Sequence, residues 1–193
     1  SKKSCGKADW KTQTCSSSSL ANEGKVFIRQ LGTSEEDIPS DISIDNSGNI
    51  YVTGYTEGAF DGNSNKGNED FFLIKYSASG EKIWTRQHGS NSSDWARGIA
   101  IDTSENIILT GGTTGKLTGS KNLGSYDIFL VKYDSNGSIQ WTQQVGTSTV
   151  DDGHAVTTDS SDNIYITGRT WGGLDGSNKP DVCKNVTTTA GKV

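Results

Sequence analysis

The sequence predicts an all-β protein built from a repeated unit of four short strands, and three observations support this prediction. Residues 127–147 repeat residues 70–90, with 10 of 21 positions identical. A second pattern ends in glycine three times, at Gly54, Gly111 and Gly168, which are 57 residues apart. Hydrophobic residues make up only 31% of the chain, which has 24 glycines and two prolines. A fixed period indicates a repeat architecture, and this composition is typical of short strands joined by glycine-rich turns.

The first hairpin of each unit surrounds a polar turn of the form Asp-x-Ser-x-Asn. A short strand precedes this turn, and a strand rich in Ile, Tyr, Val and Thr follows it and runs to the repeated glycine. Such runs, bounded by turn residues, are typical of paired antiparallel strands. The first strands are expected at residues 41–44, 98–101 and 155–158.

The second hairpin of the unit joins residues 71–76 to residues 82–88 in the first copy. Residues 77–80 supply a Ser- and Gly-containing turn between these two apolar runs. In the second copy the turn is Asp134 to Gly137 and contains Asn-Gly, which provides the positive φ angles of a tight turn. One unit therefore holds four strands.

The chain starts its repeat on the fourth strand of a unit, because residues 26–32 align with residues 83–89. It stops after three strands of a last unit, so the strands make whole units only if the N-terminal strand completes the last one. This arrangement predicts a β-propeller, in which closure hides the sheet edges. Residues 24–193 would form the propeller, and the Ser-rich residues 1–23 a flexible N-terminal tether. The expected three blades span about residues 37–89, 94–146 and 151–193, with strand 25–32 closing the ring.

Together these motifs resemble the bacterial SBBP β-propeller repeat. The first hairpin carries Ile-Asp-x-Ser-Gly-Asn-Ile-Tyr-Val-Thr-Gly, and the second carries Asp-x-Phe-Leu-x-Lys-Tyr followed by Trp-Thr-x-Gln-x-Gly. The resemblance covers residues 24–180, with the blocks in register. It implies a β-propeller and an exported, lipoprotein-like location at the bacterial cell surface, in the outer membrane or in the periplasm. It brings no catalytic motif.

The chain departs from the repeat in two ways. Its unit of 57 residues is longer than the roughly 40–50 residues usual for a blade. The excess lies in long loops between the second and third strands, whose apolar residues Phe60, Leu117 and Leu174 are expected to turn inward. In the last unit, residues 181–191 lose the apolar pattern, which leaves a truncated or decayed propeller open as an interpretation. The long loops span residues 57–69, 114–126 and 171–180.

Composition limits the partners and the compartment. The net charge of −5 and the lack of a basic cluster argue against a nucleic-acid partner. No apolar run approaches the roughly 20 residues of a membrane span. The chain contains no Met, so we expect that a leader was removed or that the chain was trimmed. Three cysteines, Cys5, Cys15 and Cys183, allow at most one internal disulfide, and their pairing stays open.

Three aspartates, Asp37, Asp94 and Asp151, recur just before the first strands. They could form a ring of carboxylates that binds a structural cation. An Asp side chain that caps a turn is the favoured interpretation. We therefore expect no cofactor.

Most other repeated residues are interpreted as structural, because a catalytic group is needed once and these occur once per unit. The aromatic residue of the fourth strand is expected to pack between sheets, and the glutamine three positions later to bind backbone. This structural set is Phe27, Trp84, Trp141, Gln30, Gln87, Gln144, Gly54, Gly111 and Gly168.

Non-repeating loop residues are the better candidates for ligand contact, because loops on a rigid scaffold usually carry binding. Trp95 and Trp171 break the repeat and are expected to be exposed. The candidate binding residues are Trp95, Trp171, Phe60, Asp61 and Asp175.

The favoured function is a non-enzymatic exported propeller that presents a loop face to a protein or glycan, as an adhesin or scaffold does. One alternative is a polysaccharide hydrolase or lyase with its active site in the axial channel. A hydrolase needs paired carboxylates about 5–10 Å apart. Asp37, Asp94 and Asp151 could supply them only if they face the channel. A decayed propeller without activity is the third interpretation.

Two assemblies fit three blades. A self-closed monomer is slightly favoured, because the long loops could fill the gaps that three blades leave between them. The alternative is a homodimer, in which two open half-rings join into six blades by two-fold symmetry.

Overall fold

The computed structural model describes residues 27–117, 119 and 122–174, and these contain ten strands and no helix. The strands are β1 (Asp37–Ile44), β2 (Ile50–Thr56), β3 (Asp70–Tyr76), β4 (Lys82–His88), β5 (Asp94–Ile101), β6 (Ile107–Thr113), β7 (Asp127–Tyr133), β8 (Ile139–Val145), β9 (Asp151–Thr158) and β10 (Ile164–Thr170). Residues 27–31 belong to a part of the chain separate from residues 32–174, and every feature below is built from residue 32 onward. Within the described ranges no helix has the length and hydropathy needed to cross a membrane.

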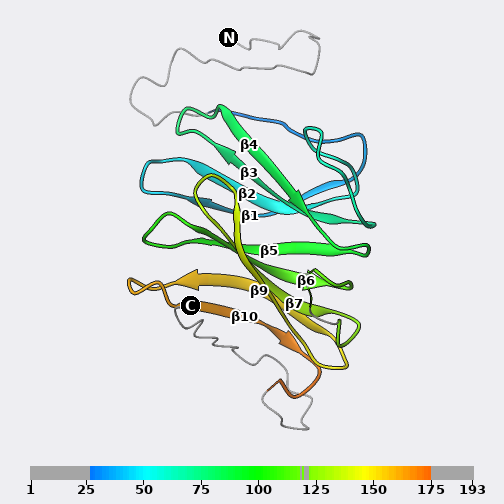
Figure 1. Ribbon diagram of the computed structural model, residues 1–193. Helices are drawn as coiled ribbons and strands as arrows, with labels where there is room; N and C mark the ends of the chain where they lie inside the picture. Colours follow the sequence, from blue (N-terminus) through cyan, green and yellow to red (C-terminus); the bar gives the residue numbers. More distant parts are fainter. Residues whose placement is uncertain (1–26, 118, 120–121, 175–193) are drawn as a thin grey trace, which may run out of the picture. The chain divides into compact units, whose positions relative to one another are not determined.

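The strands form three antiparallel sheets that follow the repeat (Figure 1). Strands β1–β4 form the sheet of unit 1 and β5–β8 the sheet of unit 2, each in sequence order. In unit 3, β9 pairs with β10. Units 1 and 2 therefore confirm the all-β prediction and the four-stranded unit.

Several expectations fall outside what the structure describes. Residues 27–33 contain no strand where the N-terminal strand was expected, and the part of unit 3 that it would join follows residue 174. The number of blades and the closure of the ring therefore stay predictions. The tether 1–23, the three cysteines and the altered stretch 181–191 also lie outside the described residues.

The first strand of every unit contains a β-bulge opposite the repeated glycine. A Cβ on Gly111 would lie 1.8 Å from the carbonyl oxygen of Trp95, and Gly54 and Gly168 meet the same obstacle. Only glycine lets the second strand approach the bulged backbone this closely. A bulge re-aims one side chain away from the ladder. The bulged residues are Ser40, Arg97 and His154.

We call the face of a sheet that is turned toward the following unit its front and the opposite face its back. The front of unit 1 and the back of unit 2 share one buried cluster, in which the rings of Phe71 and Phe129 stack 4.7 Å apart. A second cluster joins the front of unit 2 to unit 3. The first cluster consists of Tyr51, Phe71 and Leu73 against Ala96, Ile99, Ile107, Leu109, Phe129, Val131 and Tyr133. The second consists of Ile108, Ile128 and Leu130 against Ile164 and Ile166.

Two of the three aromatic residues of the fourth strand expected between the sheets, Trp84 and Trp141, are found there. Trp84 packs on the first cluster and Trp141 on the second. From the long loops, Leu117 and Leu174 join the same two clusters. Phe60 is buried, with its ring edge against Phe72. The inward orientation predicted for the loop residues is confirmed.

Candidate ligand-binding site

The aspartates that begin the first strands bind the residue four positions earlier in the chain. Asp94 Oδ2 accepts hydrogen bonds from the backbone N–H and the hydroxyl of Ser90, at 2.6 and 2.9 Å. Thr33 and Thr147 make the same contacts with Asp37 and Asp151. These are the bonds of a carboxylate that fixes a turn. Burial raises the pKa of Asp94 above its usual value, because its hydrogen bonds offset only part of the cost of desolvation.

Metal ligation needs several donors that converge on one point. Among the described residues, no group of three or more His, Cys, Asp or Glu side chains has that arrangement.

The repeated glutamines fix the long loops to the sheets. Gln87 Oε1 accepts the backbone N–H of Phe60 at 2.9 Å, and its Nε2 donates to the Gly58 carbonyl at 2.9 Å. Gln144 makes the matching pair with Leu117 and Gly115. The backbone contacts expected for these glutamines are thus present, and their partners lie in the loop between the second and third strands. The loop ends of units 1 and 2 are consequently held in a defined conformation.

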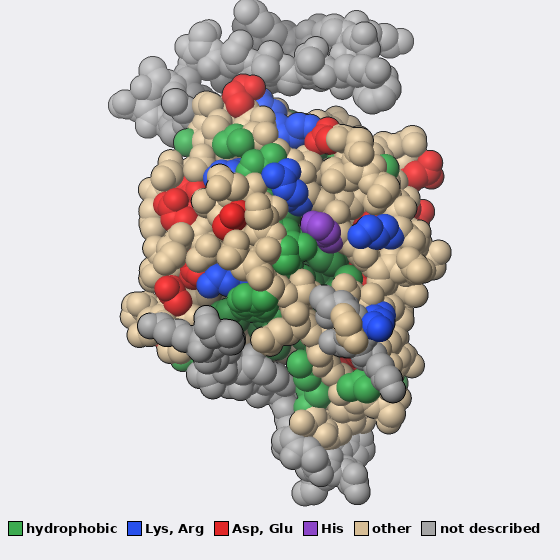
Figure 2. All heavy atoms as spheres, viewed as in Figure 1, with side chains coloured by type: hydrophobic (Ala, Val, Ile, Leu, Met, Phe, Trp, Pro, Cys, Tyr) green, Lys and Arg blue, Asp and Glu red, His purple; other side chains and the backbone are tan. Residues whose placement is uncertain are grey.

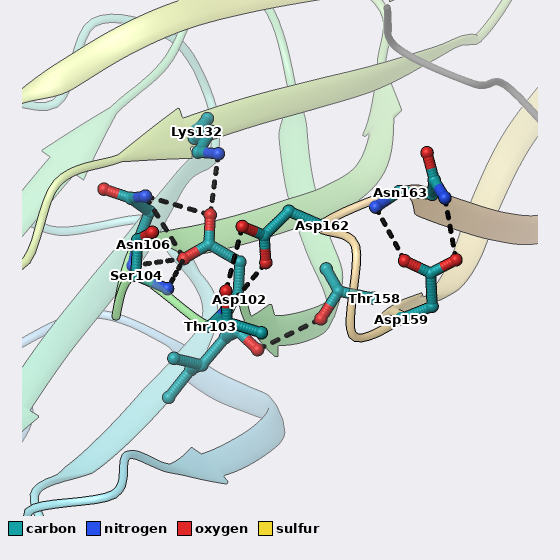
Figure 3. A network of polar contacts seen from close by, with 10 residues as sticks. Asp102, Thr103, Ser104, Asn106, Lys132, Thr158, Asp159, Asp162 and Asn163 are labelled. Carbon is teal, nitrogen blue, oxygen red and sulfur yellow. Dashed lines mark hydrogen bonds and ion pairs between the residues drawn. The ribbon is translucent and has the colours of Figure 1, made fainter. Parts of the chain in front are cut away.

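The turns at the opposite end of the units are linked by a polar network (Figure 3). Asp102 accepts hydrogen bonds from the side chain of Asn106 and lies 2.7 Å from Lys132 Nζ. Thr103 donates to both carboxylate oxygens of Asp162, at 2.8 and 2.9 Å, and so joins the turn of unit 2 to that of unit 3. Burial alone would raise the pKa of Asp102, but the bonds from Lys132 and Asn106 outweigh it and lower the pKa.

The partner of this turn aspartate differs among the units. In units 1 and 3, a tyrosine hydroxyl donates to it, from Tyr51 to Asp45 and from Tyr165 to Asp159. Unit 2 has Ile108 at that repeat position, and Lys132 supplies the partner instead. The network therefore serves to hold the turns, and its residues are engaged with one another.

Charged side chains replace the usual residues of the repeat at three neighbouring positions. We call Arg97, Asp152, His154 and Arg169 the charged cluster. Arg97 and His154 are the bulged residues of β5 and β9, where unit 1 has Ser40. Asp152 stands where unit 1 has Ile38, and Arg169 where it has Tyr55. The first strands β5 and β9 contact each other, which brings these residues together.

Asp152 is the centre of the charged cluster, with a side chain only 3% exposed. Its Oδ1 lies 3.0 Å from Arg97 Nε, and its Oδ2 lies 3.3 Å from His154 Nε2 and 3.5 Å from Arg169 Nη2. The three partners are 42%, 50% and 45% exposed. Two guanidinium groups surround one carboxylate, so the cluster is locally cationic although the chain carries −5.

The outer edge of the cluster remains accessible. Arg97 contacts Asp152 through Nε, and within the described part of the chain no contact engages its two terminal nitrogens. A guanidinium fork of this kind suits a carboxylate, sulfate or phosphate group. On the face shown in Figure 2, basic and acidic side chains are interspersed without a large area of one sign. Selectivity for an anion would thus come from local geometry.

Trp95 adjoins the charged cluster. A Cβ at Gly112 would lie 2.8 Å from Asp152 Oδ1 and 3.9 Å from Trp95 Cε3, so the indole and the carboxylate flank the same glycine. The Trp95 ring is half-buried and leans on Tyr126, with centroids 5.4 Å apart. Trp95, which was expected to contact ligand, therefore lies beside the charged cluster, which was not predicted from the sequence.

The other expected contact residues lie elsewhere. Trp171 is 63% exposed just after β10. Phe60 is buried and supports its loop, and Asp61 is bound by Lys82 Nζ at 2.6 Å and by the Thr85 hydroxyl at 2.5 Å. Asp175 lies outside the described residues. Trp95 and Trp171 thus keep surface available for a partner, whereas Phe60 and Asp61 are engaged within unit 1.

A comparison of the three copies could have found the charged cluster. At the bulge position the sequence reads Ser40, Arg97 and His154, and two positions earlier it reads Ile38, Trp95 and Asp152. Both positions differ in all three copies, and in units 2 and 3 they hold charged, imidazole or aromatic side chains. The sequence alone did not show that the bulge turns these side chains toward one another.

The family repeat coincides with the internal period. The model of the beta-propeller repeat family SBBP matches residues 26–65, 83–116 and 140–175, and these matches start 57 residues apart. They cover more than half of the chain. The chain belongs to the SBBP beta-propeller repeat family. The resemblance seen in the sequence is confirmed, and with it the propeller repeat fold of the sheets.

Two curated proteins share this similarity. The chain is 30% identical over 156 residues to an uncharacterized WD repeat-containing protein, L264, of Acanthamoeba polyphaga mimivirus. It is 26% identical over 168 residues to the regulatory protein FlaEY of Caulobacter vibrioides. The alignments cover 70% and 80% of this chain but only 10% and 18% of those proteins. The chain therefore spans less than a fifth of the length of either relative.

Solved structures show weaker similarity. A luciferin-regenerating enzyme aligns with a TM-score of 0.38 at 16% identity, over 76% of this chain and 45% of that one. The WD40 domain of Neurospora crassa Pan2 aligns with a TM-score of 0.36 at 15% identity, over 68% of this chain and 44% of that one.

Proposed function

We propose that this chain is a non-enzymatic binding module, whose charged cluster and adjoining Trp95 contact an acidic group on a protein or glycan ligand. The observation that carries the proposal is the concentration of non-repeating, half-exposed basic side chains, two of them guanidinium groups, around the buried Asp152. Asp152 orients the guanidinium groups and leaves donors directed outward. Trp95 offers an apolar ring edge beside them, as sugar rings and peptide side chains require.

An active site on the first strands is the competing function. A hydrolase would use two free carboxylates, whereas each of the three strand-opening aspartates is bound by the hydroxyl and backbone N–H of the residue four positions earlier. Incubation with acidic and neutral polysaccharides, followed by assay of new reducing ends or unsaturated products, tests this alternative. Product formed by the purified chain would support the enzyme and count against a purely binding role.

The binding proposal is tested with two anionic probes and one neutral one. Polygalacturonate represents a carboxylated glycan, polyglutamate an acidic protein segment, and dextran a neutral glycan. Calorimetric titration should show salt-dependent binding of one anionic probe and none of dextran, because the contact is electrostatic. The active probe would identify the ligand class.

Matched variants locate the contact. Arg97→Ala combined with Arg169→Ala should weaken binding about tenfold or more, as expected when charge-assisted hydrogen bonds are lost. Lys82→Ala removes an exposed cation from β4 that pairs with Asp61, and it should leave binding unchanged. Failure of both anionic probes, or equal affinity of the double variant, would contradict the proposal.

We further propose that this binding takes place outside the cell, which the family resemblance supports. Protease treatment of intact native cells should then degrade the protein, while a cytosolic marker survives. Protection until the cells are lysed would contradict an exposed location.

A further inference from the structure

A row of four large hydrophobic side chains, three of them aromatic, crosses from unit 3 to unit 2. Trp171 directly follows β10, and its backbone N–H donates to the carbonyl oxygen of Val150 at 2.9 Å. Val150 directly precedes β9 and forms a parallel β-bridge with Tyr126. The Tyr126 ring in turn contacts the ring of Trp95, with centroids 5.4 Å apart. We call Trp171, Val150, Tyr126 and Trp95 the aromatic row.

The aromatic row and the charged cluster lie on the same face of unit 3. In the pairing of β9 with β10, Asp152 lies opposite Arg169. Two residues further toward the loops on both strands, the backbone bond of Trp171 sets it opposite Val150. Side chains alternate between the two faces of a sheet, and residues directly opposite each other share a face. A ligand that lies on the aromatic row can therefore also contact the charged cluster.

Gly112 brings the two sets of side chains together in unit 2. A Cβ at this position would lie 2.8 Å from Asp152 Oδ1 and 3.9 Å from Trp95 Cε3. Units 1 and 3 have Tyr55 and Arg169 at the same repeat position. Because unit 2 has glycine there, no side chain separates the Trp95 indole from the charged cluster.

The junction of units 1 and 2 has the same backbone frame with different side chains. Thr114 N–H donates to the Ser93 carbonyl oxygen at 2.9 Å, and Asp94 N–H donates to the Glu69 carbonyl oxygen at 2.8 Å. These bonds match those of Trp171 and of Asp151 one period later. The frame therefore forms without aromatic side chains. The counterparts of the aromatic row, in the same order, are Thr114, Ser93, Glu69 and Ile38.

The shared face is accessible to a ligand. Trp171 is exposed, and so are the guanidinium groups of Arg97 and Arg169. Val150, Tyr126 and Trp95 are half-buried, so their positions are fixed by neighbouring residues while part of each side chain reaches solvent. From Trp171 to Tyr126 the row crosses two strand spacings, or about 10 Å. This length suits an extended chain of rings better than a single small molecule.

We propose that this face binds a chain of uronic acid sugars, with sugar rings on the aromatic row and ring carboxylates at Arg97 and Arg169. The inference rests on the proposed binding function and names the class of its ligand. Tryptophan and tyrosine rings offer a large apolar surface to the C–H face of a sugar. A guanidinium fork binds a carboxylate through two parallel hydrogen bonds. A uronic acid carries its carboxylate directly on the ring, which matches the close approach of the Trp95 indole to the charged cluster.

An acidic peptide matches only half of this surface. Its carboxylates could reach the guanidinium groups, but its acidic side chains would leave the aromatic row uncovered. Holding those flexible side chains in one conformation also costs conformational entropy. The rings of a sugar chain are more rigid, so the aromatic row favours the glycan over the peptide.

Calorimetric titration of the full chain with two trianions tests the ligand class. Trigalacturonate carries three carboxylates on sugar rings, and a triglutamate peptide with blocked ends carries three carboxylates without rings. The wild type should bind trigalacturonate about tenfold more tightly than the peptide. Trp171→Ala should remove most of this difference and leave the affinity for the peptide unchanged. Trp171→Phe retains a ring and should keep most of the affinity for the sugar.

Two further variants separate the ring contact from the charge contact. Arg97→Ala combined with Arg169→Ala should weaken the binding of both trianions, because both need the guanidinium groups. The matched control is Ile83→Ala, which removes an exposed apolar side chain from β4 and should change neither affinity. Circular dichroism should show unchanged β-structure for every variant.

The outcomes distinguish this inference from the proposed function. Equal or tighter binding of the peptide would overturn the uronic acid ligand, although a binding module for acidic groups would stand. Unchanged sugar affinity in Trp171→Ala would overturn it as well. Binding of neither trianion would also overturn it, and the polymeric probes would then show whether the proposed function fails with it.

Discussion

Units 1 and 2 carry closely similar sequences in different surroundings. Phe71 and Phe129 stack on each other, yet they belong to opposite faces of their sheets and occupy different repeat positions. Ile42 and Ile99 occupy the same position, and only Ile99 is covered. The repeat therefore specifies an apolar face on each sheet, and a neighbouring unit is needed to bury that face. The stability of the protein is the sum of the stabilities of its units and of the junctions between them.

The largest expected difference between the two units concerns this pair. Ile99→Ala should lower the free energy of unfolding by about 2–4 kcal/mol, because it leaves a cavity at a formed junction. Ile42→Ala should cost less than about 0.5 kcal/mol in dilute solution, where no neighbour covers the side chain. Urea unfolding measures both, and equal costs would show that the face of unit 1 is already buried.

A smaller difference is expected for the loop clamps. Gln87 is 6% exposed and holds the loop of unit 1 through two backbone groups, whereas Gln144 is more exposed. Gln87→Ala should cost about 1–3 kcal/mol, since it strands a buried N–H and a carbonyl. Gln144→Ala should cost less. The urea midpoints of the two variants test this order. A lower midpoint for Gln144→Ala than for Gln87→Ala would show that the glutamine of unit 2 contributes more.

The pH dependence should differ in sign between two aspartates. The pKa of Asp102 is lowered in the folded protein. Its contribution to the free energy of unfolding is therefore present above pH 3.8, the usual pKa of the group, and is lost as the pH falls through the pKa of the folded state. Burial raises the pKa of Asp70 in the folded protein. Its contribution to the free energy of unfolding is therefore present below pH 3.8 and is lost as the pH rises through the pKa of the folded state.

These signs are measured with two variants. Asp102→Asn should lower stability at neutral pH by about 1–3 kcal/mol, the range of hydrogen bonds to a charged group, and should approach the wild type in acid. Asp70→Asn should gain on the wild type as pH rises. Urea unfolding at several pH values gives the free energy of unfolding of each protein as a function of pH. Parallel curves for the wild type and the variants would contradict the pKa shifts assigned to Asp70 and Asp102.

The smallest effect should come from the outer ion pair of unit 1. Lys82 and Asp61 lie 2.6 Å apart, with side chains 34% and 37% exposed. Lys82→Ala should cost less than about 1 kcal/mol and lose that effect in high salt. In unit 2, Lys132 pairs with Asp102, whose side chain is 1% exposed. Lys132→Ala should cost more, because Asp102 would remain desolvated. Thermal unfolding at two salt concentrations separates the pairs.

Much of the fold followed from the period alone. Residues 71–76 and 82–88 were expected as strands, and β3 (Asp70–Tyr76) and β4 (Lys82–His88) match them. β1 begins at Asp37, earlier than residue 41, because pairing with β2 continues past a bulge that apolar alternation does not reveal. Local pattern predicts strands, and tertiary contacts decide where they start.

The candidate site was only partly predictable. Trp95 was identified because it interrupts the repeat. Arg97, Asp152 and Arg169 were missed, since Arg97 lies 55 residues before Asp152 in the chain and reaches it only through the β5–β9 contact. Arg169 joins them from β10, the strand that pairs with β9. Charge partners of this kind depend on how neighbouring units pack, which the sequence of one unit does not specify.

The bulge opposite the repeated glycine has an evolutionary consequence. It gives every unit one residue that neither the ladder nor the core constrains, as the sequence Ser40, Arg97 and His154 illustrates. A gene that duplicates a unit therefore acquires another freely mutable position, already placed on the first strand beside its neighbours. New specificities can arise by single substitutions there, while the scaffold keeps its inherited stability.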